Sequence, residues 1–413
     1  MAGFVGNIVE WYDFALYGYM ASFLSTLFFP GEDRLASLLA TYGVFAAGFV
    51  MRPLGSALFG WFGDTFGRTT TMLVSGALMA LPTFALGCLP TYETAGVWAA
   101  VLLVLVRLAQ GLSVGGEFSS SVTYLVETAK QGRRGFAGSW ANVGSVTGML
   151  LGSGAAVAIT SVFSHETVLD WAWRLPFLFG AAIGLAAILI RRRLPDSEHF
   201  RRHRDDHGET SPLRQALTRN LDATVKATVF ASMYGVVFYF AMVYLPTWAA
   251  EQAGYDLDLA MRINAAATAV LLLLIPLAGW LSDRVLRRTH LIALAMAGTA
   301  ILGWPLFAVM AQSGSPEMLA LGQFALALLV ALPLGAAPAM FVEMFPASDR
   351  LSGYSVSYNL GLGVVGGATP MIATGLIKWS GSVVAAGVFL TVAGAIGIVA
   401  AWTIRDRSRE TLR

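Results

Sequence analysis

Residues 60–68, Gly-Trp-Phe-Gly-Asp-Thr-Phe-Gly-Arg, return in altered form at residues 279–288, Gly-Trp-Leu-Ser-Asp-Arg-Val-Leu-Arg-Arg. The aspartates of the two stretches, Asp64 and Asp283, are 283 − 64 = 219 residues apart. Each stretch follows a long apolar run and ends in a basic residue. The sequence therefore contains the same short polar turn twice, about half a chain length apart.

A second motif repeats at nearly the same distance. Glu127 and Arg134 return as Glu343 and Arg350, and both offsets are 216 residues (343 − 127 and 350 − 134). Two unrelated motif pairs with nearly one offset indicate a duplicated unit. Parallel repeats of this kind are typical of one large class of membrane transporters, whose substrate site lies near the bilayer midplane between the two halves.

The composition indicates that most of the chain meets lipid. Of 413 residues, 56% are hydrophobic and only 13% are charged, whereas soluble proteins carry about a quarter charged residues. A helix needs about 20 mostly apolar residues to cross a bilayer. Twelve stretches meet this rule: 5–28, 37–61, 70–89, 95–119, 134–162, 172–192, 223–249, 260–282, 289–311, 317–341, 352–377 and 382–403. We therefore predict an all-α membrane protein with twelve transmembrane helices in two pseudo-symmetric six-helix bundles.

A polar stretch from Arg191 to Asp222 separates the two halves. The predicted organisation is an N-terminal bundle at 1–193, a cytoplasmic linker at 194–221, a C-terminal bundle at 222–405 and a cytoplasmic tail at 406–413. The first apolar stretch is longer than the core of a signal peptide and lacks a cleavage site, so no cleaved leader is expected. The single cysteine, Cys88, excludes a disulfide framework and a cysteine-based zinc site.

Basic residues predict the orientation of the chain in the cell (inner) membrane. The loops that follow even-numbered spans contain Arg68, Lys130, Arg133, Arg134, Arg284, Arg287, Arg288, Arg350 and the arginines of the linker. The other loops contain acids such as Glu32, Glu93, Glu166, Asp170 and Asp256. The alternation keeps its phase along the whole chain, so both termini and the linker are expected in the cytoplasm.

These motifs resemble a known family. Gly-x-x-x-Asp-x-x-Gly-Arg at 60–68 is similar to the signature loop of the major facilitator superfamily, and Arg107-Leu-Ala-Gln-Gly111 resembles its second motif. Four further stretches resemble the metabolite:proton symporters within it: Gly6-Asn-x-x-Glu-Trp-Tyr-Asp-Phe14, Arg52-Pro-Leu-Gly55, Gln110-Gly-x-Ser-x-Gly-Gly-Glu117 and Asp170-Trp-x-Trp-Arg-x-Pro-Phe177. The resemblance covers essentially the whole chain.

The resemblance implies proton-coupled symport by alternating access of a small organic acid or a zwitterionic osmolyte, since such carriers transport α-ketoglutarate, citrate, shikimate, proline or glycine betaine. Two departures weaken the expected locking role of the signature loop. Thr69 to Thr71 follow it where further bases are usual, and Leu286 replaces a glycine in the second copy. The chain also ends without the coiled-coil heptads of an osmosensing relative, which argues against osmosensing rather than transport.

Charged residues inside spans are expensive and need a partner, water or a function. Glu10 and Asp13 are three residues apart on one helical face, and we predict a proton-coupling role for them, with static ion pairs as the alternative. Arg52 and Arg107 can bind a substrate carboxylate through a planar two-pronged donor or can be permanent partners of the acids. For Arg52 the bracing role is favoured, and for Arg107 both roles are open.

Further candidates for substrate binding are one acid and several polar or aromatic side chains: Glu117, Asn142, Tyr234, Phe238, Tyr358 and Asn359. The amides and Tyr358 either line the cavity or bond a neighbouring helix. The aromatic residues of span seven either pack or hold a quaternary ammonium group by cation–π attraction. Glycines at four-residue spacing, Gly144, Gly148 and Gly152, predict close helix packing.

The repeated polar motifs predict a cytoplasmic gate in two sets. Asp64, Arg68, Glu127 and Arg134 form the first set, and Asp283, Arg284, Glu343 and Arg350 form the second. Their family resemblance implies that each set locks the inner side in the outward-facing state. An ordinary charged helix end explains any one of these residues but not a set that recurs in both halves.

Other function classes fit less well. The sequence has no phosphate-binding loop for an ATP-driven pump. His199, His203 and His207 can form a metal site, but a solvated loop helix explains them better. We therefore expect no enzyme activity, cofactor, metal or nucleic acid, and no obligatory protein partner. The expected partners are protons, lipid and a carboxylate or zwitterion. A drug/proton antiporter of the same fold is the main rival, followed by a uniporter.

Overall fold

The computed structural model describes residues 2–32, 34–192 and 218–412, and all its regular structure is helical. The N-terminal half contains α1 (Ala2–Phe28), α2 (Arg34–Phe66), α3 (Arg68–Cys88), α4 (Tyr92–Ala95), α5 (Val97–Glu127), α6 (Arg134–Val162), α7 (His165–Thr167), the π-helical turn η1 (Val168–Ala172) and α8 (Arg174–Arg191). The C-terminal half contains α11 (Leu221–Tyr239), η3 (Phe240–Tyr244), α12 (Leu245–Glu251), α13 (Leu257–Arg284), α14 (Arg288–Ser313), α15 (Pro316–Met344), α16 (Arg350–Tyr358), η4 (Asn359–Gly366), α17 (Thr369–Ser380) and α18 (Ala385–Thr403).

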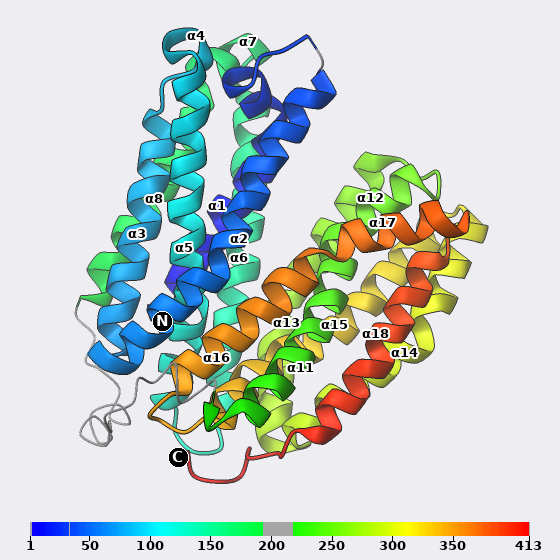
Figure 1. Cartoon of the computed structure of the whole chain (residues 1–413). Helices are drawn as coiled ribbons and strands as arrows, with labels where there is room; N and C mark the ends of the chain where they lie inside the picture. The colour runs from blue at the N-terminus through cyan, green and yellow to red at the C-terminus, as the bar shows by residue number, and fades with distance from the viewer. Residues whose placement is uncertain (1, 33, 193–217, 413) are drawn as a thin grey trace.

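The all-helical membrane fold is confirmed. Within the described ranges, ten helices are long and apolar enough to cross a membrane, and the bent pair of α7 with η1 and α8 gives an eleventh. Helix α1, whose apolar run is interrupted by Glu10 and Asp13, lies among the N-terminal helices as the remaining member of the twelve (Figure 1). Helix α8 ends at Arg191 and α11 begins at Leu221, which brackets the expected linker; the domain boundaries themselves stay predictions.

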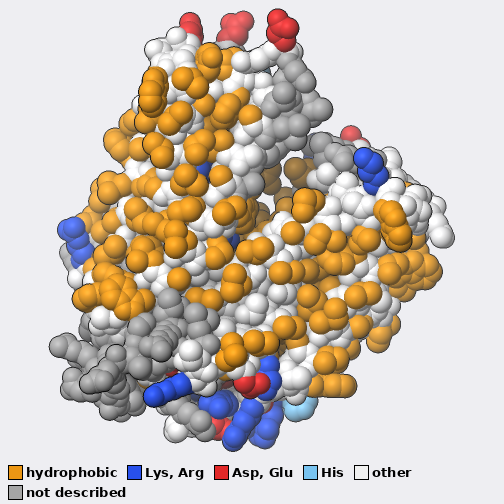
Figure 2. Space-filling model, viewed as in Figure 1, with side chains coloured by type: hydrophobic (Ala, Val, Ile, Leu, Met, Phe, Trp, Pro, Cys, Tyr) orange, Lys and Arg blue, Asp and Glu red, His pale blue; other side chains and the backbone are white. Residues whose placement is uncertain are grey.

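The two halves meet at one end of the molecule and diverge at the other (Figure 1). We call the end that holds the C-terminal residues 404–412 the tail side. Basic side chains gather on the tail side and acidic ones on the opposite side, while the flanks between them are largely hydrophobic (Figure 2). This distribution is that of a membrane protein with an apolar belt.

Glycines allow the helices of the N-terminal half to approach closely. A Cβ at Gly152 of α6 would lie 2.6 Å from the carbonyl oxygen of Tyr12 on α1. Only a hydrogen fits at this contact, so the predicted packing role of the spaced glycines is confirmed for Gly152. Gly148 likewise meets the α1 backbone.

Two expected spans contain a wide π-helical segment. The stretch 223–249 forms α11, η3 and α12, and 352–377 lies on α16, η4 and α17. At η4 the Asn359 amide donates to the Ser355 carbonyl at 2.9 Å, and the segment Asn359–Gly366 has four glycine or small-side-chain turns that accept the wider ring. Such π-segments occur frequently at functional sites, and both lie in the half that faces the cleft described below.

Candidate functional site

A buried ion pair lies inside the N-terminal half. Arg107 of α5 donates from Nη1 to Asp13 of α1 at 2.6 Å, and both residues are at least nine-tenths buried. Thr83 of α3 donates to the second oxygen of Asp13 at 3.2 Å, and Gln110 donates to Thr83 at 2.9 Å. Three helices therefore fix the orientation of one carboxylate.

Arg107 is held on its other face by an aromatic ring. Its Cζ lies 3.7 Å from the ring centroid of Tyr17, a close cation–π contact. The atoms Nε and Nη2 of Arg107 form no hydrogen bond with the described residues. A guanidinium with two unused donors beside a paired carboxylate has donors left for a second anion.

Arg52 of α2 is the other cation, and its surroundings differ from those expected. Its Cζ lies 4.4 Å from the Phe49 ring centroid and 5.8 Å from that of Phe14, and among the described residues it forms no salt bridge. The expectation that Arg52 braces the bundle as the partner of an acid differs from this geometry, in which Arg107 takes Asp13. The two aromatic rings support Arg52 instead.

Both arginines line one cleft with the two acids of α1. Glu10, Asp13, Arg52, Arg107 and Phe49 surround about 350 Å³ of unfilled space, part of it open to solvent. The Oε2 atom of Glu10 has no hydrogen-bond partner within the described part of the chain. Charged groups of both signs thus face a single cleft in an otherwise apolar interior.

A second, smaller hollow lies where the two halves meet. Trp11, Asn142, Tyr234, Phe238 and Tyr358 line it, and the Asn142 amide donates to the Leu334 carbonyl at 2.7 Å. The ring of Phe238 stands edge-on to Trp11 with centroids 5.9 Å apart. Four of the predicted substrate residues are therefore brought together, but around a hollow separate from the charged cleft.

Glu117 and Asn359 lie outside both spaces. The Ser75 hydroxyl donates to Glu117 at 2.5 Å beside a pocket inside the N-terminal half. Asn359 of η4 donates to the Gly115 carbonyl of α5 at 2.9 Å. Its amide therefore joins the two halves, which is the neighbour-bonding alternative considered for it.

On the tail side, each half caps a helix of the other. The Asp64 carboxylate at the end of α2 accepts from the backbone N–H groups of Leu351 (3.2 Å) and Ser352 (2.8 Å) in the first turn of α16. The Asp283 carboxylate at the end of α13 accepts from Gly135 and Phe136 in the first turn of α6, both at 2.8 Å. A carboxylate at this position satisfies free donors and favours the positive helix end.

Ion pairs beside these caps also cross between the halves. Arg350 donates to Glu127 at 2.7 Å, and Arg134 lies 3.2 Å from Glu343, with all four side chains buried. The predicted gate residues therefore meet, but the two sets exchange members. Asp64 and Glu127 associate with the start of α16, and Asp283 and Glu343 associate with the start of α6.

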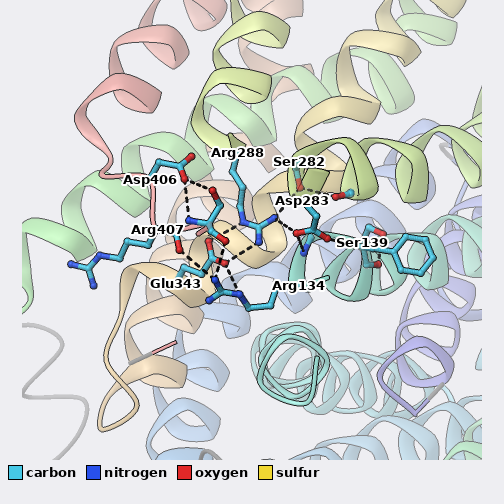
Figure 3. Close-up of polar contacts among 12 residues, drawn as sticks. Arg134, Ser139, Ser282, Asp283, Arg288, Glu343, Asp406 and Arg407 are labelled. Carbon is cyan, nitrogen blue, oxygen red and sulfur yellow. Dashed lines mark hydrogen bonds and ion pairs between the residues drawn. The ribbon is translucent and has the colours of Figure 1, made fainter. Parts of the chain in front are cut away.

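The second set differs in one further member. Arg284 is exposed, and Arg288 at the start of α14 takes its expected place. Arg288 pairs with Glu343 through two hydrogen bonds at 2.8 and 2.9 Å and with Asp283 at 3.1 Å (Figure 3). Alignment of helix starts rather than motif letters would have identified it, since α3 begins at Arg68 as α14 begins at Arg288. The side chain of Arg68 lies outside the described residues.

The C-terminal tail joins the same cluster. Nη2 of Arg134 donates to the backbone carbonyls of Arg407 (3.4 Å), Ser408 (3.0 Å) and Glu410 (2.7 Å). Asp406 accepts from the N–H (2.9 Å) and the hydroxyl (3.0 Å) of Thr289 in α14 (Figure 3). The sequence gave no reason to expect this role for the tail, because most of its contacts are made by backbone atoms.

Among the described residues, no group of three His, Cys, Asp or Glu side chains is placed to hold a metal ion. The histidines His199, His203 and His207 lie outside the described residues. The structure therefore offers no test of the alternative metal site in the linker.

Comparison with known proteins agrees with this architecture. The family model for sugar and other transporters matches residues 1–228, and the model for the major facilitator superfamily matches 260–413. A solved structure of the proton:xylose symporter XylE superimposes with a TM-score of 0.84 at 18% identity, over 100% of this chain and 96% of that chain. At this identity the likeness concerns the fold.

Three characterised relatives span nearly the whole chain. The citrate-proton symporter of Klebsiella pneumoniae is 32% identical over 99% of this chain and 91% of its own length. The α-ketoglutarate permease of Escherichia coli (strain K12) is 36% identical over 90% and 85%. The proline/betaine transporter of the same strain is 29% identical over 100% and 84%. All three are transporters rather than enzymes. The chain belongs to the major facilitator superfamily of secondary active transporters and, within it, to the metabolite:proton symporter family.

Proposed function

We propose that this protein imports a small carboxylate-bearing solute, an organic acid or a zwitterion, together with protons by alternating access. The observation that supports the proposal most is the charged cleft, in which Arg107 is already paired with Asp13 while Arg52 forms no salt bridge among the described residues. A substrate carboxylate can bind Arg52 and the unused donors of Arg107.

Proton coupling follows from competition for Arg107. With the anion bound, the attraction between Arg107 and Asp13 is shared, and a less stabilised carboxylate in an apolar interior takes up a proton more readily. Asp13 is then neutral while the halves rearrange, and the proton leaves when Arg107 pairs with it again. Glu10, which lines the same cleft, is a second acid available to this exchange.

Orientation is part of the proposal. The basic side chains on the tail side match the rule that cytoplasmic loops carry the excess of Lys and Arg. We therefore place the tail side in the cytoplasm of the cell that holds the protein in its inner membrane, which makes the cleft outward-facing. A fluorescent reporter fused after Arg413 should then mature in the cytoplasm, and a reporter active only outside should be silent there.

Transport is tested in proteoliposomes with a panel of citrate, α-ketoglutarate, proline, glycine betaine and xylose. An inward proton gradient should drive accumulation of at least one carboxylate solute, and a protonophore should abolish it. Asp13→Asn should lose accumulation yet keep part of the exchange, whereas Asp222→Asn, whose side chain is exposed, should resemble the unmodified protein. Accumulation driven by outward proton flow would support the antiporter alternative, and preference for xylose would contradict the carboxylate assignment.

A further inference from the structure

Tyr239 is a buried residue of the C-terminal half that reaches the charged cleft of the N-terminal half. It is the last residue of α11, directly before η3, and is 3% exposed. Its hydroxyl lies near the Arg52 guanidinium and the Glu10 carboxylate. In the described part of the chain the hydroxyl forms no hydrogen bond of ordinary geometry.

An unsatisfied buried hydroxyl is unfavourable, so a native structure that keeps one usually has a use for it. Tyr234, one helical turn earlier, differs because its hydroxyl lies by Asn142 and Tyr358. Tyr239 therefore has a donor that its neighbours in the same span have already used. The ring is fixed in place, since a Cβ at Gly366 would lie 3.2 Å from its Cδ2 atom.

Arg52 approaches this hydroxyl from the other half. Its Cδ atom would lie 3.9 Å from a Cβ at Gly363 of η4, so the side chain extends from α2 to the backbone of the C-terminal half. Phe49 and Phe14 support the guanidinium from the N-terminal side. Arg52 and Tyr239 thus present donors toward each other across the boundary between the halves, and no acceptor of the described chain lies between them in an ion pair.

We infer that Arg52 and Tyr239 bind the same carboxylate of the substrate, one from each half. The guanidinium and the phenol hydroxyl both donate to the anion, so its binding draws the C-terminal half toward the N-terminal one. Tyr239 is then a residue that determines specificity for a carboxylate over its neutral amide. This inference rests on the proposed function, because it assigns a contact of the same site.

The test compares Tyr239→Phe with Tyr354→Phe in proteoliposomes, using the best carboxylate of the panel and its amide as probes. Tyr354 is the matched control, since its hydroxyl is also buried and without a hydrogen-bond partner among the described residues but belongs to α16 away from the cleft. Tyr239→Phe should weaken the apparent affinity for the acid about 10- to 100-fold, as expected for a lost hydrogen bond to a charged group. Affinity for the amide should stay within about twofold, and Tyr354→Phe should change neither value.

The Arg52→Gln background provides a second measurement. If both side chains hold one anion, the effect of Tyr239→Phe should largely disappear there, because interacting residues are not additive. Equal affinities for the acid in Tyr239→Phe and the unmodified protein, or equal losses for the acid and the amide, would overturn the inference while leaving the proposed function intact. If the unmodified protein transports no member of the panel, both fail together.

Discussion

At the scale of single residues, the decisive contrast is between the two arginines of the cleft. Arg107 satisfies Asp13 in a place where neither side chain reaches bulk water. Removing one partner of a buried pair leaves an uncompensated charge, which is far more costly than removing both. Arg52 is supported by aromatic rings and has no such dependent acid among the described residues.

Arg107→Ala is therefore expected to destabilise the protein by about 3–5 kcal/mol. Adding Asp13→Asn should recover much of this loss, because the orphaned carboxylate is then neutral. Thermal unfolding in detergent measures both variants. Arg52→Ala is the control and should lose about 1 kcal/mol from its ring contacts. An Arg107→Ala protein as stable as the unmodified one would contradict the pairing.

Asp349 gives the tail-side contact a dependence on pH. Burial raises the pKa of this carboxyl above its ordinary value, and the nearby Asp64 adds to the effect, against hydrogen bonds from Asn220 and Ser348 and the charge of Arg350. A raised pKa means that the closed state binds the proton more tightly. Closure is therefore favoured as the pH falls through that pKa and is disfavoured above it.

Asp349→Asn, which resembles the protonated form, should favour the closed tail side at neutral pH and remove its pH dependence. The reporter is alkylation of Cys in a Ser352→Cys, Cys88→Ser protein, since the Ser352 side chain is buried between the halves and its hydroxyl forms no hydrogen bond with the described residues. Slower alkylation is expected in Asp349→Asn. Faster alkylation would show that the charge of Asp349 is needed for closure.

At the scale of elements, the unusual feature is that α6 and α16 are capped from the other half. Their own preceding residues, Arg133 and Asp349, make no side-chain cap. The caps from Asp64 and Asp283 therefore exist only while the tail side is closed. Opening this side leaves the first turns of both helices without these acceptors until water replaces them.

Asp64→Asn and Asp283→Asn should each weaken closure by about 1 kcal/mol, the usual value of a helix cap. Opening of the tail side should then become about fivefold more frequent, measured by the same cysteine reporter. The double variant should add the two effects, because the caps lie on different helix pairs. Glu317→Gln at the start of α15 serves as a control far from this contact. An unchanged alkylation rate in both single variants would contradict the lock.

Sequence patterns predicted the elements well because bilayer thickness imposes one length on every span. The helices α13, α14 and α15 begin and end within three residues of the stretches 260–282, 289–311 and 317–341. The π-segments were not predicted, since a wider turn depends on tertiary contacts and leaves no distinct apolar period. Within the candidate site, the residue types were found, but not which arginine pairs with Asp13, because that choice depends on rotation of helices about their axes.

At the scale of the whole molecule, the tail side is closed by contacts of three kinds: caps, ion pairs and the C-terminal tail. The tail connects Arg134 of one half with Thr289 of the other. Burial alone would raise the pKa of Asp406, but hydrogen bonds from Ser408 and Thr289 together lower it. The stabilisation from this lowered pKa is present above the ordinary value for Asp and is lost only as the pH falls through the folded value.

The tail should therefore stay attached across the neutral range, and Asp406→Asn should release it. Trypsin cleavage after Arg407 and Arg409 is the measurement, because a protease needs the backbone free, and Arg134 holds it. Cleavage should be faster in Asp406→Asn than in the unmodified protein or in Asp222→Asn. Equal rates in all three would mean that the contact with Thr289 does not retain the tail.

The exchanged caps have a further consequence for how such a molecule arises. Asp64 contacts Leu351 and Ser352 as Asp283 contacts Gly135 and Phe136, and these acceptors and donors are separated by 219 and 216 residues in turn. Each contact is thus the image of the other, as in an isologous interface across a two-fold axis. Two identical six-helix subunits could make both contacts at once as a homodimer. The two halves of this chain, produced as separate polypeptides, should therefore still recognise each other and copurify.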